Sequence, residues 1–160
     1  MEETNKTGLL SVVLPAYNEE ASVPRAAQVI GGLLSGAGIP HEIIFVDDGS
    51  RDHTWEVIQA QAGRYPQVRG VKFSRNFGKE AAIFAGLAQS RGACTVVLDC
   101  DLQHPPEKIL EMYRLWQEGY QVVEGVKTSR GKESPLHTLA AKTFYSIISN
   151  ATGIDMSRAS

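Results

Sequence analysis

The sequence has few cysteines and no long apolar run. Its two cysteines, Cys94 and Cys100, are six residues apart, a separation of about 20 Å in an extended strand, which is beyond disulfide reach. We therefore expect reduced thiols in the core of a soluble, cytoplasmic domain. No window holds the roughly 18 consecutive apolar residues that a membrane span needs. The polar, acidic start MEETNKTGLL also lacks the features of a signal peptide.

An excess of charge of one sign is also missing. Sixteen Lys and Arg stand against eighteen Asp and Glu, for a net charge of −2. No nucleic acid partner is therefore expected, and no anionic membrane is expected as the main partner. Two nucleotide-binding motifs are absent as well. The first turn, LPAYNEE, lacks the glycines of a dinucleotide fingerprint, and no GKS or GKT of a P-loop occurs.

What the sequence does have is an alternation of short β-branched runs with longer segments of helical period. The predicted strands are 9–14, 42–46, 68–73, 94–98 and 121–126, and the predicted helices are 20–34, 54–64, 78–89, 106–118 and 136–150. Runs such as EIIFVDD and CTVVLDCD are apolar on both faces, which is typical of parallel strands covered by helices. The pattern predicts an α/β fold with an open, mostly parallel sheet and helices on both faces.

Unusual residues follow three of these strands. PAYNEE comes after the first strand, DDGS after the second and DCDLQHPP after the fourth. Open α/β sheets bind their ligands at the carboxyl ends of the strands. Asp47, Asp48, Asp99 and Asp101 would repel one another there without a cation or hydrogen-bond donors, so the pattern indicates a metal site.

The Asp-x-Asp pair formed by Asp99 and Asp101 suits such a site. In an extended backbone the two side chains lie on the same side, about 7 Å apart, and both can reach one cation or its bound phosphates. Together with the amide oxygen of Gln103 they form a set of hard oxygen ligands. This set favours Mg²⁺ or Mn²⁺ over zinc.

Ordinary structural roles are the alternative for the same residues. Asp101 could cap a helix that begins at Pro106, while Asp99 merely ends a strand. The DDGS segment could be a simple strand-to-helix turn. His104 and His137 have no Cys or second His at ligand spacing, so we expect surface or packing roles for them.

Four motifs in order carry a family resemblance: SVVLPAYNEE, IIFVDDGSRDHT, FSRNFGKEAAIFAGLAQSRG and VVLDCDLQHPPE. This set closely resembles the catalytic domain of the inverting GT-A glycosyltransferases. RNFGKEAA and DLQHPPE resemble the polyprenyl-phosphate branch, which includes dolichyl-phosphate mannose synthases and bactoprenol glucosyltransferases. The resemblance covers residues 9–152. It implies that 1–160 form a single, Rossmann-like GT-A domain that is incomplete at its C-terminus.

The resemblance also implies roles for individual residues. The nucleotide of a UDP- or GDP-linked sugar would be held by Pro15, Ala16, Tyr17, Glu19, Asp48, Lys79 and Asp99. The ligands of a Mg²⁺ or Mn²⁺ ion that bridges the donor diphosphate would be Asp99, Asp101 and Gln103.

The implied reaction is sugar transfer to polyprenyl phosphate (undecaprenyl or dolichyl phosphate) with inversion. Asp101 would act on the donor side, and Lys127 with Arg130 would position the acceptor phosphate. That phosphate is largely dianionic at pH 7 and already nucleophilic. Asp155 could belong to the same acceptor region. The full-length protein would work at the cytoplasmic face of the membrane, through segments outside this chain.

Two other functions stay open at this point. The chain could be a nucleotide-sugar-binding fragment without turnover, or a glycosyltransferase with a soluble acceptor. The apolar stripe on the predicted helix at 136–148 favours core or dimer packing over lipid contact, so a homo-oligomer is possible. The sugar and the base are not specified by any of these motifs.

Overall fold

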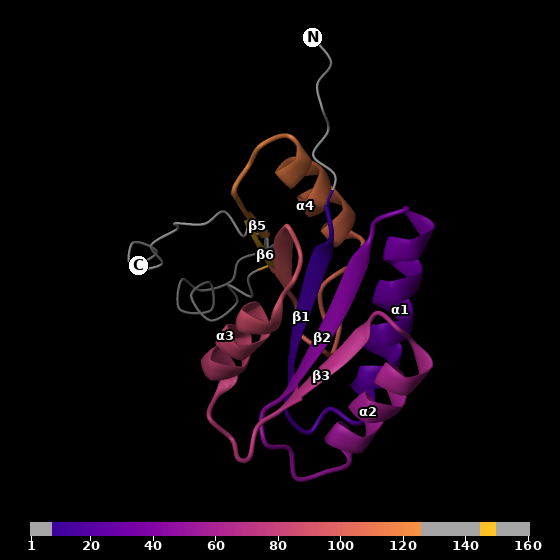
Figure 1. Ribbon diagram of the computed structural model, residues 1–160, viewed down its shortest axis with the longest axis vertical. Coiled ribbons are helices and arrows are strands. Elements are labelled where there is room, and N and C mark those ends of the chain that lie inside the picture. The colour runs from indigo at the N-terminus through magenta and orange to yellow at the C-terminus, as the bar shows by residue number, and fades with distance from the viewer. Residues whose placement is uncertain (1–7, 126–144, 150–160) are drawn as a thin grey trace, which may run out of the picture.

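Figure 1 shows the computed structural model, which describes residues 8–125 and 145–149. In chain order its elements are β1 (Leu10–Ala16), α1 (Ser22–Gly36), β2 (His41–Asp47), α2 (Thr54–Arg64), β3 (Val68–Lys72), α3 (Lys79–Gln89), β4 (Cys94–Val97), α4 (Lys108–Gln117), β5 (Val122–Gly125) and β6 (Tyr145–Ser149). The elements predicted up to residue 126 are all present, with ends shifted by at most two residues.

The strands form one sheet in the order β3-β2-β1-β4-β6-β5. β1 pairs in parallel with β2 and β4, and β2 pairs in parallel with β3, whereas β6 is antiparallel to both β4 and β5. Nearly every residue of β1 and β2 is buried, which explains their continuous apolar runs. The predicted open, mostly parallel α/β sheet is confirmed.

Helices cover both faces of the sheet, and each face has its own core. Successive residues of β1 point to opposite faces, so Val12 and Leu14 pack with residues of α1, α2 and α4 while Val13 packs with a residue of α3. On the α3 side the helix lies very close to the sheet. A Cβ atom added to Gly86 would be 2.3 Å from Cγ1 of Val13, so only glycine allows this approach.

The predicted helix at 136–150 is wrong where the structure describes it. Tyr145–Ser149 form β6, which pairs with β4 so that Val96 lies opposite Ile147. A segment as short as YSIIS fits both a helical and a strand period, and its two neighbouring isoleucines favour a strand. Pairing with β4 and β5 then decides the conformation. Residues 136–144 and 150 lie outside the described residues.

A buried polar network joins the strands at their amino ends. The Glu42 carboxylate accepts hydrogen bonds from Oγ of Ser11 (2.7 Å), from the backbone N–H of Arg91 (2.7 Å) and from the guanidinium of Arg69 (2.9 Å). Burial alone would raise the pKa of Glu42, but these donors outweigh it and lower the pKa below its usual value. The network lies at the edge of the sheet opposite to the carboxyl ends of β1 and β2.

Both cysteines are buried and unpaired, as predicted. Within 8–125 and 145–149, no helix combines the length and the hydropathy needed to cross a bilayer.

Candidate active site

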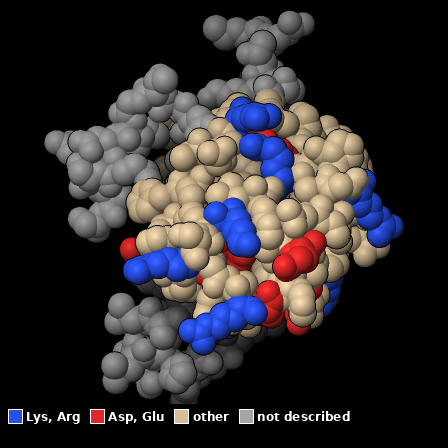
Figure 2. Space-filling model, turned by 60° about the horizontal axis from the view of Figure 1, so that its bottom comes forward, with Lys and Arg blue, Asp and Glu red and all other residues tan. Residues whose placement is uncertain are grey.

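A hollow of about 290 Å³ lies at the carboxyl ends of β1, β2 and β4. It is lined by Pro15, Ala16, Tyr17, Glu19, Asp48, Lys79, Asp99, Cys100 and Asp101. Every residue predicted to hold the nucleotide is in this set, together with Asp101. Figure 2, which brings the lower side of Figure 1 forward, shows acidic and basic side chains next to one another on this face. The residues predicted to hold the nucleotide are therefore brought together at one edge of the sheet.

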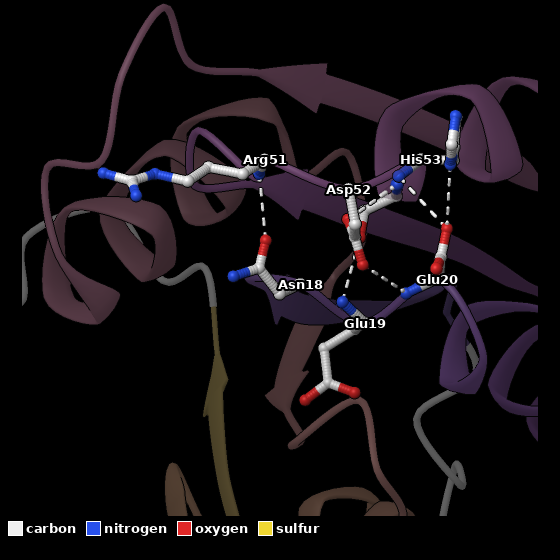
Figure 3. A network of polar contacts seen from close by, with 7 residues as sticks. Asn18, Glu19, Glu20, Arg51, Asp52 and His53 are labelled. Atoms are coloured by element: carbon white, nitrogen blue, oxygen red, sulfur yellow. Dashed lines mark hydrogen bonds and ion pairs between the residues drawn. The ribbon is translucent and has the colours of Figure 1, made fainter.

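The loop after β1 is held in place by the loop after β2 (Figure 3). Asn18 has a positive φ of 52°, and its side-chain oxygen accepts a hydrogen bond from the backbone N–H of Arg51 at 2.9 Å. The backbone N–H of Asn18 donates to Oγ of Ser50, and that of Glu19 donates to Oγ1 of Thr54, both at 2.9 Å. Each of these bonds joins a backbone N–H of one segment to a side-chain oxygen of the other, and none of them uses the Glu19 side chain. The Glu19 carboxylate points away from the network and lines the hollow.

The same contact is strengthened by Asp52 at the start of α2. Its carboxylate accepts hydrogen bonds from the backbone N–H (2.9 Å) and the hydroxyl of Thr54, and from the backbone N–H of Glu20 (3.4 Å). Desolvation alone would raise the pKa of Asp52, but these donors outweigh it and lower the pKa. His53 and Glu20 add an ion pair at 3.3 Å when the imidazole is protonated. The two loops are thus linked to each other by several hydrogen bonds beside the hollow.

The two aspartates at the end of β2 have different environments. Asp47 is 1% exposed and its Oδ1 accepts the backbone N–H of Ser50 at 3.0 Å, which is the turn role weighed for DDGS. Asp48 is 4% exposed and faces the loop before α3. Its Oδ1 accepts the N–H groups of Phe77 (2.8 Å) and Gly78 (3.2 Å), and its Oδ2 accepts the Asn76 amide (3.2 Å).

Asp99, which follows β4, is paired with Lys79, the first residue of α3. The Lys79 ammonium lies 2.6 Å from Oδ1 of Asp99, and the two side chains are 58% and 27% exposed. Asp101 is exposed, and its Oδ1 accepts a long hydrogen bond, 3.3 Å, from the backbone N–H of Gln103. α4 begins at Lys108 and has no side-chain cap, so the alternative role of Asp101 as a helix cap is wrong.

The predicted ligands Asp99, Asp101 and Gln103 all offer oxygen atoms, which a hard cation prefers. In the described part of the chain, no three His, Cys, Asp or Glu side chains converge to hold a metal ion. Mg²⁺ typically takes only one or two protein carboxylates and completes its shell with substrate phosphates and water. Asp99 and Asp101 can supply those carboxylates. Gln103 is exposed and does not line the hollow, so its role as a ligand stays a prediction.

Cys100 lies between the two aspartates and lines the hollow without being reactive. It is 3% exposed. Burial, reinforced by the negative charges of Glu19, Asp101 and Asp99, raises the pKa of its thiol to about 12. The thiol is therefore neutral at physiological pH.

Other predicted residues are placed elsewhere. His104 is half-buried beside Leu98, Leu102 and Pro106, in agreement with a packing role. Lys127, Arg130, His137 and Asp155 lie outside the described residues.

The sequence patterns do not predict the partners of Asp48. Within the RNFGKEAA motif they single out Lys79 alone. The amide side chain of Asn76 and the glycine at position 78, whose φ is 102°, are the available signals that this segment makes a specific turn.

Known proteins resemble this chain over most of its length. The sequence profile named Glycosyl transferase family 2 matches residues 11–157. The chain is 40% identical to the undecaprenyl-phosphate 4-deoxy-4-formamido-L-arabinose transferase of Pseudomonas paraeruginosa over 149 residues, which cover 92% of this chain and 44% of that protein. The chain spans less than half the length of the curated relatives it matches.

Two solved structures share the fold of this chain. The glucosyl-3-phosphoglycerate synthase of M. tuberculosis is 30% identical, with a TM-score of 0.57 over 71% of this chain and 43% of its own. The mannosyltransferase PcManGT from Pyrobaculum calidifontis, solved with GDP-Man and Mn2+, has a TM-score of 0.57 over 72% of this chain and 33% of its own. At 22% identity the second likeness shows the fold alone. The fold expected from the motifs, GT-A, is confirmed.

Proposed function

Because the chain belongs to glycosyl transferase family 2, we propose that it is the donor-binding part of a metal-dependent enzyme that transfers a sugar from a nucleoside diphosphate to polyprenyl phosphate. The observation that carries the proposal is the hollow at the carboxyl ends of β1, β2 and β4. It combines the two Asp-x-Asp carboxylates with a lysine and with the loop after β1. A nucleoside diphosphate with a divalent cation needs both anionic and cationic groups in one small space.

In the proposed complex the nucleoside lies against the loop after β1. Tyr17 is 42% exposed and lines the hollow, where its ring suits stacking on a base. Glu19 presents a carboxylate that can accept a hydrogen bond from the base or ribose. The connected loops behind them keep these groups in place before the donor arrives, which lowers the cost of ordering them on binding.

The diphosphate lies between Lys79 and the Asp-x-Asp pair. A Mg²⁺ or Mn²⁺ ion held by Asp99 and Asp101 would act as a Lewis acid that stabilises the negative charge developing on the leaving nucleotide. The Lys79 ammonium, which is paired with Asp99 and 58% exposed in the structure, would turn toward the phosphate oxygens. In-line attack by the acceptor phosphate then inverts the anomeric carbon, with Lys127 and Arg130 positioning that phosphate.

The relative from Pseudomonas paraeruginosa supports a lipid phosphate as acceptor, since its name includes undecaprenyl phosphate. In this proposal the membrane contact comes from segments outside the chain, at the cytoplasmic face. A soluble acceptor is the second candidate, because a glucosyl-3-phosphoglycerate synthase shares the fold at 30% identity. A binding fragment without turnover is the third.

One set of assays separates these candidates. Labelled UDP- and GDP-linked sugars are incubated with the chain, Mn²⁺ and either a short-chain polyprenyl phosphate or 3-phosphoglycerate. Label in the lipid product supports the proposal, and label in phosphoglycerate supports the second candidate. Nucleotide binding by calorimetry without transfer to either acceptor supports the third. If no UDP or GDP derivative binds with Mn²⁺, the proposed function is wrong.

A further inference from the structure

The RNFGKEAA segment is attached to the end of β2 by one buried carboxylate. Asp48 accepts the backbone N–H groups of Phe77 and Gly78 and the side-chain amide of Asn76. The Asn76 amide also donates to the backbone oxygen of Asp48 at 3.2 Å. We call these four residues the Asp48 anchor. Because Asp48 is only 4% exposed, its hydrogen bonds are shielded from water.

The backbone next to the anchor is tightly packed. Gly49 has a φ of 68°, and a Cβ atom there would be 2.2 Å from the backbone carbon of Arg75. The segment therefore lies directly on the turn after β2. Gly78, with a φ of 102°, then turns the chain into α3.

Lys79 follows at once, so the anchor decides where its side chain starts. The Lys79 side chain is long and 58% exposed, and an exposed lysine has many conformations of similar energy. Its ammonium nevertheless lies 2.6 Å from Asp99, beside the hollow that both residues line. A shift of the preceding backbone would move the point from which this side chain starts and so lower the fraction of conformations in which its ammonium meets Asp99.

We propose that Asp48 and Asn76 are positioning residues, which hold the backbone before Lys79 so that its ammonium faces Asp99 and, in the complex, the donor diphosphate. The inference rests on the proposed function for its ligand. It differs from the role that the family resemblance gives to Asp48, a direct contact with the nucleotide. The hydrogen bonds of both Asp48 oxygens to the anchor support the indirect role.

A set of variants tests this proposal. Asn76→Asp places two carboxylates against each other and should open the anchor. The exchange variant combines Asp48→Asn with Asn76→Asp. Its new amide at position 48 can still accept the Phe77 and Gly78 N–H groups through the oxygen, while its nitrogen donates to the new carboxylate at position 76. The hydrogen bond from residue 76 to the backbone oxygen of residue 48 is lost, so the exchange restores the anchor only in part. The exchange variant has the same net charge as the wild type. Lys79→Ala is the reference for loss of the ammonium.

Calorimetry with Mn²⁺ then compares uridine and guanosine with UDP and GDP. We expect Asn76→Asp and Lys79→Ala each to weaken binding of the diphosphate about tenfold, while nucleoside binding changes less than about twofold. Adding Lys79→Ala to Asn76→Asp should cause no further loss, since both changes remove the same contact. The exchange variant should recover part of the diphosphate binding that Asn76→Asp loses, by at least about threefold.

Two results would overturn the proposal. One is additive losses in the double variant. The other is a loss of nucleoside affinity in Asp48→Asn that equals its loss of diphosphate affinity, which would mean direct contact with the base or ribose.

A measurement without nucleotide separates the anchor from the proposed function. The rate of Lys79 acetylation, read by mass spectrometry, should rise in Asn76→Asp and fall again in the exchange variant. Unchanged rates would contradict the anchor even if the wild type binds nucleotide. If the rates follow the anchor but no nucleotide binds, the proposed function fails and the positioning of Lys79 at Asp99 remains supported.

Discussion

The ammonium of Lys79 lies 2.6 Å from Oδ1 of Asp99, one of the two carboxylates proposed to hold the divalent cation. If Asp99 holds the cation as proposed, lysine and cation compete for the same carboxylate when no nucleotide is present. In the proposed complex the diphosphate offers the lysine a new partner. On this proposal the ion pair balances the charge of Asp99 until both ligands bind.

The first prediction follows from this competition. Lys79→Met should raise the affinity of Mn²⁺ alone, by up to about fivefold, because a partly exposed ion pair is worth about 1 kcal/mol or less. The same change should lower the affinity for UDP or GDP. Calorimetry measures both, and Lys108→Met, which removes an exposed lysine of α4, is the control. A parallel fall in both affinities would contradict the competition.

The second prediction concerns Asp101. Asp101→Asn keeps one oxygen ligand but loses the charge that offsets the cation, so nucleotide binding in Mn²⁺ should fall about tenfold or more. In EDTA the variant and the wild type should bind equally weakly. Glu111→Gln, an equal change of charge on α4, should leave binding unchanged. Equal affinity of the wild type in EDTA and in Mn²⁺ would show that the Asp-x-Asp pair does not act through a metal.

The third prediction concerns the network of Glu42. Its pKa is lowered in the folded chain, so its contribution to the free energy of unfolding is present above the unfolded pKa, about 4.5, and is lost as the pH falls below it. Glu42→Gln should cost about 1–3 kcal/mol near pH 7. The difference from the wild type should shrink on acidification. Urea unfolding at several pH values measures it, and a difference that does not depend on pH would argue against the ionised carboxylate.

The fourth prediction concerns the two thiols. Burial raises the pKa of both Cys94 and Cys100 to about 12, from an ordinary value of 9.0. The unfolded thiols ionise at lower pH, so stability should fall as the pH rises from about 9 toward about 12. At a pH of about 10 the loss should be about 1 kcal/mol per thiol. Urea unfolding at a pH of about 8 and again at about 10 measures the loss. The free energy of unfolding should fall less in the double variant Cys94→Ala, Cys100→Ala than in the wild type.

The fifth prediction contrasts two helical glycines. Gly86→Ala would bring a Cβ to 2.3 Å from Val13, so we expect a loss of about 1–3 kcal/mol from overpacking. Gly32→Ala in α1 meets no atom within 4 Å and should stabilise by about 0.4–1 kcal/mol. Thermal unfolding measures both. Equal effects would mean that the approach of α3 to β1 is not as close as described.

The sequence was enough to predict which loops would meet. PAYNEE, DDGS and DCDLQHPP each follow a parallel strand, and parallel strands end at the same edge of a sheet. It was not enough to predict what each carboxylate touches. Asp48 and Asn76 are 28 residues apart, and no local period connects them. The same limit explains β6, because a segment of only five residues takes its conformation from the strands beside it.

The strand order has a consequence for how the protein is made. β4 pairs with β1 on one side, but on the other side it pairs with β6, which is encoded after β5. During synthesis β1 to β4 can assemble while the second edge of β4 still waits for residues that have not left the ribosome. An unpaired edge with a buried strand behind it is a site for wrong association between nascent chains. The time between translation of Val97 and Ser149 is thus the interval in which a chaperone would be of most use to this protein.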